Sequence, residues 1–275
     1  MQQNAFMESH IMEPKIEEVL QSFREIAHSD SAEIRELLPS VFVVAEPGCG
    51  TSSFGKAYAQ ILDESPLLQI RGTETFLELV FPKDNPQDER LFFSSPQRAV
   101  SVRNRFYGTM LVSFAEYSGQ ELLKSDGFQR MLEFIEQNKN NIHFMFHVLP
   151  EFTAKKQLLA KLQEHINMIE VELDKPGLDR ASTYVISVLK EAGIQITPAC
   201  RKRLKERVLE PVIAMGTYSG YRTLNNLVLG IRYEVTCSNM GNRDVLSEEL
   251  MDRIEARYAA KVLCDKESNR IGFFG

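Results

Sequence analysis

The sequence contains little cysteine, and its cysteines lie far apart. Cys49, Cys200, Cys237 and Cys264 form no C-x-x-C motif. Closely spaced pairs are typical of zinc sites, and dense cysteine frameworks are typical of small secreted domains with disulfides. We therefore expect neither a zinc site nor a disulfide framework, and we predict reduced thiols in a cytoplasmic protein.

Long apolar runs are absent as well. No window of the sequence approaches the ~18 apolar residues that a membrane-spanning helix requires. The first residues, MQQNAFMESHIMEP, have neither the basic region nor the apolar core of a signal peptide. These features predict a cytoplasmic protein without membrane insertion.

The chain also lacks an excess of basic residues. It has 32 Lys and Arg against 38 Asp and Glu, which gives a formal net charge of −6. Domains dedicated to nucleic acid usually carry a basic excess, and the basic segment RKRLKER at 201–207 is interrupted by Glu206. Segment 98–107 instead combines arginines with Phe106 and Tyr107, a composition enriched at protein interfaces. We expect protein partners rather than nucleic acid.

Strand and helix patterns alternate over the first part of the 275-residue chain. Apolar runs predict strands at 41–44, 67–70, 109–114, 142–148 and 168–173. Apolar residues at helical spacing predict helices at 14–28, 54–62, 96–106, 125–138 and 151–164, with Ser125 as an N-cap. Segment 82–90 is rich in Pro, Asn and Asp and predicts a loop. This alternation is typical of an α/β fold with a mostly parallel sheet covered by helices on both faces.

After the DKPG turn at 174–177 the pattern changes to helices alone. Apolar spacing predicts helices at about 178–192, 198–215, 220–237 and 247–262, with no strand between them. We place a domain boundary near 175. The prediction is an N-terminal arm and helix (1–38), an α/β domain (39–175), and a helical domain with a C-terminal tail (176–275).

A glycine-rich turn, AEPGCGTSS, joins the first predicted strand to an amphipathic helix. This is the setting of the phosphate-binding motif G-x-x-x-x-G-K-[ST], in which backbone N–H groups bind the phosphates and a hydroxyl binds Mg²⁺. Threonine occupies the lysine position, so the cation that neutralises the β- and γ-phosphates is missing. Lys56 lies more than one helical turn further along. The candidate nucleotide-binding residues are Gly48, Cys49, Gly50, Thr51 and Ser52, and Ser52 is also the candidate metal ligand.

This loop, the order of the elements and three further segments resemble the AAA+ branch of the P-loop ATPases, most of all the CbxX and stage V sporulation protein K group. GTMLVSFAEY at 108–117 resembles the second nucleotide motif of that group, SGYR at 219–222 its lid motif, and RIGF at 270–273 its common ending. The resemblance implies a parallel-sheet AAA+ core followed by a small α-helical lid. It also implies ATP or ADP with Mg²⁺ as ligand, and an AAA+ ATPase or a second copy as partner. Arg222 would then point towards the phosphates, although a surface arginine at a helix start is an equal alternative.

The chain departs from the family pattern at the end of the third predicted strand. The family places an Asp-Glu pair there, one carboxylate for magnesium and one to activate water. These positions hold Phe114 and Ala115, and Glu116 lies one place further on. Because adjacent strand residues point to opposite faces, a shift by one residue is not equivalent. Glu116 is the catalytic candidate only if the site is active.

Two more family positions differ. The arginine that acts on the neighbouring subunit falls on Gln163 or His165, and the sensor position falls on His147 or Val148. Apolar residues at the magnesium and carboxylate positions leave little support for metal-assisted hydrolysis. The sequence therefore predicts a degenerate AAA+ ATPase-like protein that acts as a structural or regulatory subunit. Two alternatives stay open: a clamp-loader-like, DNA-associated subunit, and an atypical active ATPase that uses Ser52, Glu116, Arg222 and Lys56.

Overall fold

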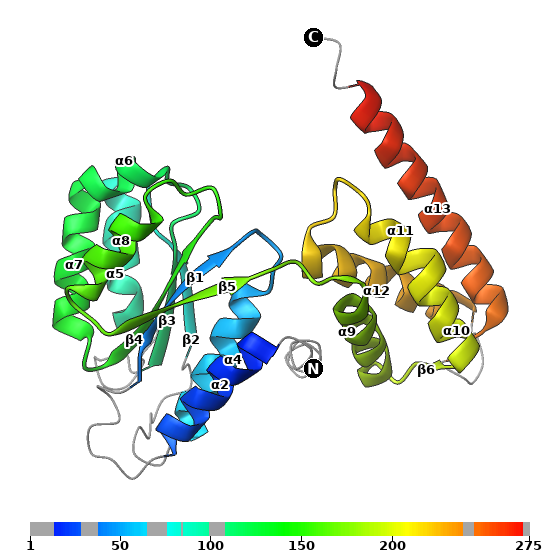
Figure 1. Ribbon diagram of the computed structural model, residues 1–275, viewed down its shortest axis with the longest axis horizontal. Coiled ribbons are helices and arrows are strands. Elements are labelled where there is room, and N and C mark those ends of the chain that lie inside the picture. The colour runs from blue at the N-terminus through cyan, green and yellow to red at the C-terminus, as the bar shows by residue number, and fades with distance from the viewer. Residues whose placement is uncertain are drawn as a thin grey trace. The chain divides into compact units, whose positions relative to one another are not determined.

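The computed structural model describes residues 14–28, 38–64, 76–83, 85–98, 108–238 and 245–271. By its internal contacts the chain divides into two units (Figure 1). The first contains Lys15–Glu46 and Thr51–Asp174, and the second contains Pro47–Gly50 and Lys175–Gly275. By its contacts, the short turn Pro47–Gly50 thus belongs to the second unit, although it connects a strand and a helix of the first unit.

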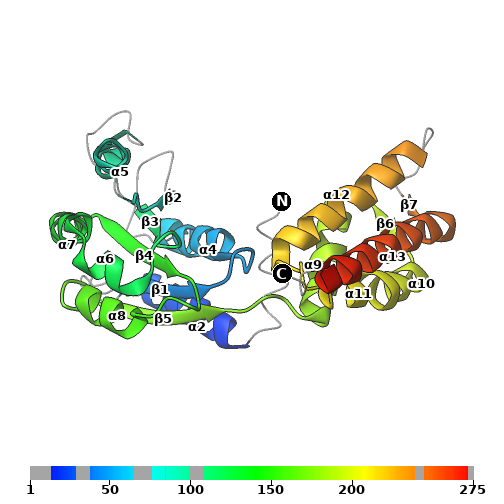
Figure 2. The same ribbon diagram turned by 90° about the horizontal axis from the view of Figure 1, so that it is seen from above.

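A five-stranded parallel sheet forms the centre of the first unit (Figures 1 and 2). Its strand order is β2-β3-β4-β1-β5, and each neighbouring pair is parallel. The strands are β1 (Ser40–Ala45), β2 (Phe76–Val80), β3 (Gly108–Ser113), β4 (Ile142–Val148) and β5 (Met168–Leu173). The predictions of β1, β3, β4 and β5 are confirmed, whereas β2 is absent from the sequence-based predictions.

One face of the sheet is covered by α2 (Pro14–Ala27) and α4 (Thr51–Glu64). Phe23 of α2 meets Tyr58 of α4 edge to face, with ring centroids 4.7 Å apart. The absence of a side chain at Gly55 lets α4 lie close to the sheet, since a Cβ there would be 2.6 Å from the nearest ring carbon of Phe76. This packing positions the start of α4 at the sheet.

The opposite face carries the larger apolar core. Phenylalanines of the strands and helices fill it, and Phe114, Phe128, Phe144 and Phe146 are fully buried. Ser125 caps the following helix by accepting a hydrogen bond from the N–H of Phe128 at 3.1 Å, as predicted. The helices that enclose this core are α5 (Pro86–Arg98), α6 (Gly119–Lys124), α7 (Asp126–Asn138) and α8 (Lys155–Gln163).

The helix α5 corrects one prediction. The pattern at 82–90 predicts a loop, but the helix begins at Pro86. The side-chain oxygen of Asn85 accepts a hydrogen bond from the N–H of Gln87 at 3.0 Å. Proline at a first helical position loses no intrahelical bond, and acidic residues in the first turn favour the helix dipole. The cluster of Pro, Asn and Asp therefore marks a helix start here.

The second unit is helical apart from one short strand pair. Gln195–Ile196 (β6) pairs in parallel with Val245–Leu246 (β7), so the prediction of helices alone is wrong at this point. Two residues are too few to produce a period-2 pattern. The predicted helix 198–215 is a continuous helical stretch with a π-helical segment in its middle. The helical elements are α9 (Leu178–Glu191), α10 (Pro198–Arg203), η1 (Leu204–Leu209), α11 (Glu210–Ile213), α12 (Gly220–Ser238) and α13 (Glu248–Ile271).

Some predictions fall outside the described residues. They are the strand at 67–70, most of the helix at 96–106 with its arginine and aromatic patch, and the last two residues of the RIGF ending. None of the helices in the described part of the chain has the length and apolarity that a membrane crossing needs.

Candidate functional site

The glycine-rich turn lies between β1 and α4, and two of its residues have a backbone that favours glycine. Gly48 has a φ of 92° and Gly50 a φ of 96°, in the region that side chains rarely tolerate. Thr51 is the first residue of α4, and the first N–H groups of a helix have no partner within it. Cys49 is buried, with 1% of its surface exposed.

The turn touches the start of α12 through backbone atoms. The N–H of Tyr221 donates a hydrogen bond to the carbonyl of Gly48 at 2.8 Å. A Cβ on Gly48 would lie 2.1 Å from the carbonyl oxygen of Ser219, and one on Gly220 would lie 2.6 Å from the carbonyl oxygen of Gly48. Glycine is therefore required on both sides of this contact, with or without a ligand.

Arg222 belongs to the first turn of α12, directly after this contact. Its side chain is exposed, and its Cβ lies 3.6 Å from the place that a Cβ on Gly48 would take. The position beside the loop is compatible with a role towards phosphates and equally with a surface arginine at a helix start.

Ser52 has a protein partner that the sequence analysis missed. Its hydroxyl donates a hydrogen bond to Oε1 of Glu78 on β2, at 2.7 Å. Glu78 is exposed and lies in the middle of FLELV, whose alternation places it with Phe76 on the α4 side of the sheet. Recognition of FLELV as a strand would have pointed to Glu78.

His147 links the ends of three strands. Its Nε2 lies 3.0 Å from the carbonyl of Ala45, and its Nδ1 lies 2.9 Å from the hydroxyl of Ser113. A carbonyl only accepts, so Nε2–H donates to Ala45 and the hydroxyl donates to Nδ1. Burial lowers the pKa of His147, which favours this neutral form. Val148, the other sensor position, is fully buried in the core.

The end of β3 presents an aromatic ring where the resemblance places the magnesium ligand. Phe114 is fully buried, and its ring stacks on that of Phe146 with centroids 5.8 Å apart. The N–H of Ala115 donates to the hydroxyl of Ser113 at 3.4 Å. Glu116 is exposed in the turn that follows β3. Glu116 is the acidic residue nearest in sequence to the predicted carboxylate positions, and it thus lies outside β3.

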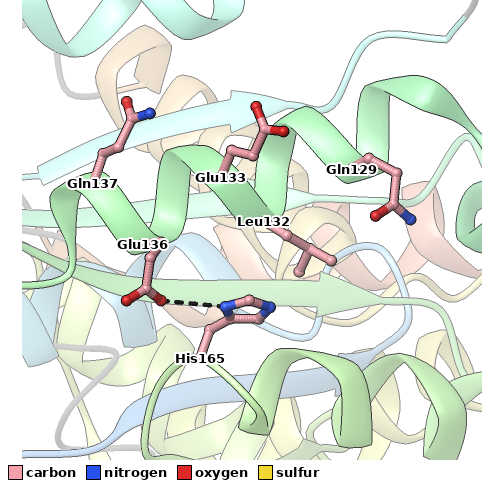
Figure 3. A pocket seen from close by; sticks show the side chains of 6 residues that line it. All are labelled: Gln129, Leu132, Glu133, Glu136, Gln137 and His165. Carbon is pink, nitrogen blue, oxygen red and sulfur yellow. Dashed lines mark hydrogen bonds and ion pairs between the residues drawn. The ribbon is translucent and has the colours of Figure 1, made fainter.

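His165 lines a pocket of about 380 Å³ between α7 and the segment after α8 (Figure 3). Its Nδ1 lies 3.2 Å from Oε2 of Glu136, which also pairs with Lys139. These two hydrogen bonds lower the pKa of the Glu136 carboxyl group. The neighbouring Gln163 donates its side-chain N–H to the carbonyl of Met168 at 3.2 Å. Both side chains therefore have partners within their own unit.

No protein-family model and no curated protein matches the chain, but solved structures share its fold. RuvB of Thermotoga maritima, a Holliday junction branch migration motor, aligns with a TM-score of 0.54 at 13% identity, over 88% of this chain and 68% of that chain. PCH-2 of C. elegans aligns with a TM-score of 0.56 at 12% identity, over 91% of this chain and 69% of that chain. Domain III of the replication initiation protein DnaA from Thermotoga maritima aligns with a TM-score of 0.52 at 10% identity, over 87% and 90%.

The chain has the AAA+ fold. The prediction of a parallel-sheet α/β core followed by a helical region is confirmed. At these identities the likeness establishes the fold alone.

Proteins with the AAA+ fold generally bind ATP or ADP with Mg²⁺, and some of the local residues of this chain would suit such a ligand. The hydroxyl of Ser52 and the carboxylate of Glu78 are oxygen donors of the kind that Mg²⁺ prefers. The N–H groups at the start of α4 suit a phosphate. Thr51, however, has no charge to offer a phosphate, and Phe114 offers no oxygen.

Proposed function

We propose that this chain is a degenerate AAA+ ATPase-like protein that does not hydrolyse nucleotide. It serves as a structural or regulatory subunit in the cytoplasm, beside an active AAA+ partner or another copy of itself. The burial of Phe114 in the phenylalanine core carries the proposal.

The surroundings of Phe114 explain why a carboxylate has no place there. The rings of Phe81, Phe128 and Phe146 lie within 6.4 Å of its own, centroid to centroid. An ionised carboxylate among these rings would lose several kcal/mol of hydration without a partner. The core is built for the aromatic side chain, and the neutral Thr51 agrees with a loop that no longer stabilises the charge of a transition state.

A steady-state ATPase assay of the pure protein with Mg²⁺ tests this proposal. We expect turnover below about 0.01 s⁻¹, against the roughly 1–10³ s⁻¹ of ordinary enzymes. An active AAA+ ATPase assayed in parallel is the positive control. Turnover near 1 s⁻¹ would contradict the proposal.

An atypical active ATPase remains the second candidate, because Glu116 is exposed directly after β3. In that case Ser52, Arg222 and Lys56 would act with it on the nucleotide. The variant Glu116→Gln separates the two functions. Turnover in the wild type that this variant abolishes supports the second candidate.

The DNA-associated alternative has less support from the structure. RuvB and DnaA act in branch migration and replication initiation, but the basic segment of this chain pairs with its own carboxylates. Arg203 contacts Asp252 and Glu255 at 2.5 Å and 2.7 Å, and Lys205 contacts Asp179 at 2.6 Å. We expect no retention on DNA at low salt, where phosphate contacts are strongest.

A pull-down from native lysate and sedimentation of the pure protein test the subunit role. We expect either an AAA+ ATPase with intact motifs among the captured proteins or an oligomer of this chain. A monomer that captures no such ATPase would contradict the role.

A further inference from the structure

The carboxylate of Glu78 lies at the start of α4, where the fold would place a phosphate. Ser52 is the second residue of α4, and its hydroxyl donates to Glu78 at 2.7 Å. Glu78 is exposed to solvent, and its side chain brings a carboxylate to this place. A phosphate bound at the first N–H groups of α4 would meet this carboxylate.

No cation balances Glu78 in the described part of the chain. The carboxylate takes part in no ion pair there, and its hydrogen-bond partner is the neutral Ser52. The residue at the lysine position is Thr51. His147 faces the same side of the sheet, and burial lowers its pKa, although its hydrogen bond to Ala45 and the charge of Glu78 act in the opposite direction.

We infer that Glu78 makes the binding of a phosphate anion at the start of α4 depend on a divalent cation. The inference rests on the proposed function, since it concerns a nucleotide that this loop binds without turnover. Glu78 acts here as a residue that determines specificity. It weakens the binding of a phosphate without a metal ion and permits the binding of a phosphate that carries one.

The chemistry of magnesium supports this dependence. Mg²⁺ is bound in proteins by one or two carboxylates together with substrate phosphates, and it keeps several waters. Glu78 and Ser52 supply two neighbouring oxygens. Without the cation the carboxylate and the phosphate repel each other. When the cation is present, both groups are its ligands. The carboxylate that the resemblance places on β3 is thus supplied by β2.

Calorimetric titration with ADP tests the inference, because ADP has no γ-phosphate to hydrolyse. Wild type and Glu78→Gln are titrated once with Mg²⁺ and once with EDTA. For the wild type we expect an affinity about tenfold higher with Mg²⁺, which corresponds to about 1.4 kcal/mol. For Glu78→Gln we expect metal-free affinity to rise by about tenfold and the effect of Mg²⁺ to fall below about threefold.

Two further variants make the result specific. Glu133→Gln removes an exposed carboxylate from α7 and should behave as the wild type. Ser52→Ala keeps the carboxylate but removes the hydroxyl, so the gain from Mg²⁺ should shrink while metal-free binding stays weak. Thermal melting of each variant shows that the fold is retained.

Three outcomes would overturn the inference: an equal effect of Mg²⁺ in wild type and Glu78→Gln, an equal loss of affinity in both buffers, or no binding of ADP by either protein in any buffer. Hydrolysis of ATP by the wild type would refute the proposed function instead. It would leave the ADP titrations interpretable, because they involve no turnover.

Discussion

Replacement of Gly48 by alanine tests whether the glycine loop is held by its contact with the start of α12. The new Cβ would lie 2.1 Å from the carbonyl oxygen of Ser219, so the two backbones must separate. Separation breaks the hydrogen bond from Tyr221 to Gly48, which is worth about 1 kcal/mol. A φ of 92° adds about 1–2 kcal/mol of backbone strain for alanine. We expect Gly48→Ala to lower the free energy of unfolding by about 2–3 kcal/mol.

Urea unfolding of the full chain without nucleotide measures this loss, followed by far-UV circular dichroism and tyrosine fluorescence. Gly193→Ala is the matched control, because Gly193 has a φ of 81° and a Cβ there would meet nothing within 4 Å. The free energy of unfolding of Gly193→Ala should therefore fall by the contribution of backbone strain alone. Gly177→Ala, with open space and no positive φ, should change stability little.

Equal losses in Gly48→Ala and Gly193→Ala would refute the reasoning, because the close approach to α12 would then contribute nothing. A loss below about 0.5 kcal/mol in Gly48→Ala, the usual range of surface substitutions, would show that the loop does not need its glycine in the absence of ligand.

Three further predictions follow from the structure. Phe114→Asp should lower the free energy of unfolding by about 3–5 kcal/mol in thermal melts, and Phe114→Leu clearly less, because only aspartate brings an unpaired charge into the core. Burial lowers the pKa of His147 in the folded state, so its contribution to stability is complete above the unfolded pKa near ~6.5 and is lost as pH falls below it. His147→Gln should flatten that decline in urea melts between about pH 7 and 5. Arg203→Met should lower the melting temperature more than Lys205→Met, since Arg203 alone of the two pairs with the half-buried Glu255.

The central strands were predictable because burial on both faces leaves continuous apolar runs. β4 occupies the predicted segment 142–148. The edge strand β5 also occupies its predicted segment, 168–173, where two glutamates interrupt the apolar residues. β2, the strand at the other edge of the sheet, was missed, and none of its five residues is buried. The similarly apolar run LLQI at 67–70 precedes it, and composition alone does not distinguish the two segments.

The site was predictable only where its residues are neighbours in the chain. The motif spacing indicated Gly48, Gly50 and Ser52, and the structure places them at the turn and at the start of α4. The partner of Ser52 is 26 positions away and arrives through the pairing of β2 with β3. No spacing within either segment carries that information, because it depends on the strand order of the sheet.

The charge at the start of α4 connects these observations. In the family pattern a lysine opposes the carboxylates at the end of β3. Here Thr51 removes the positive charge, Phe114 turns the end of β3 into core, and Glu78 keeps one carboxylate beside the loop hydroxyl. The loss of the lysine and the retention of a carboxylate both shift the local charge in the negative direction. An isolated loss of catalysis would leave binding by the loop unaffected, whereas on our inference this combination weakens the binding of a phosphate that arrives without a divalent cation.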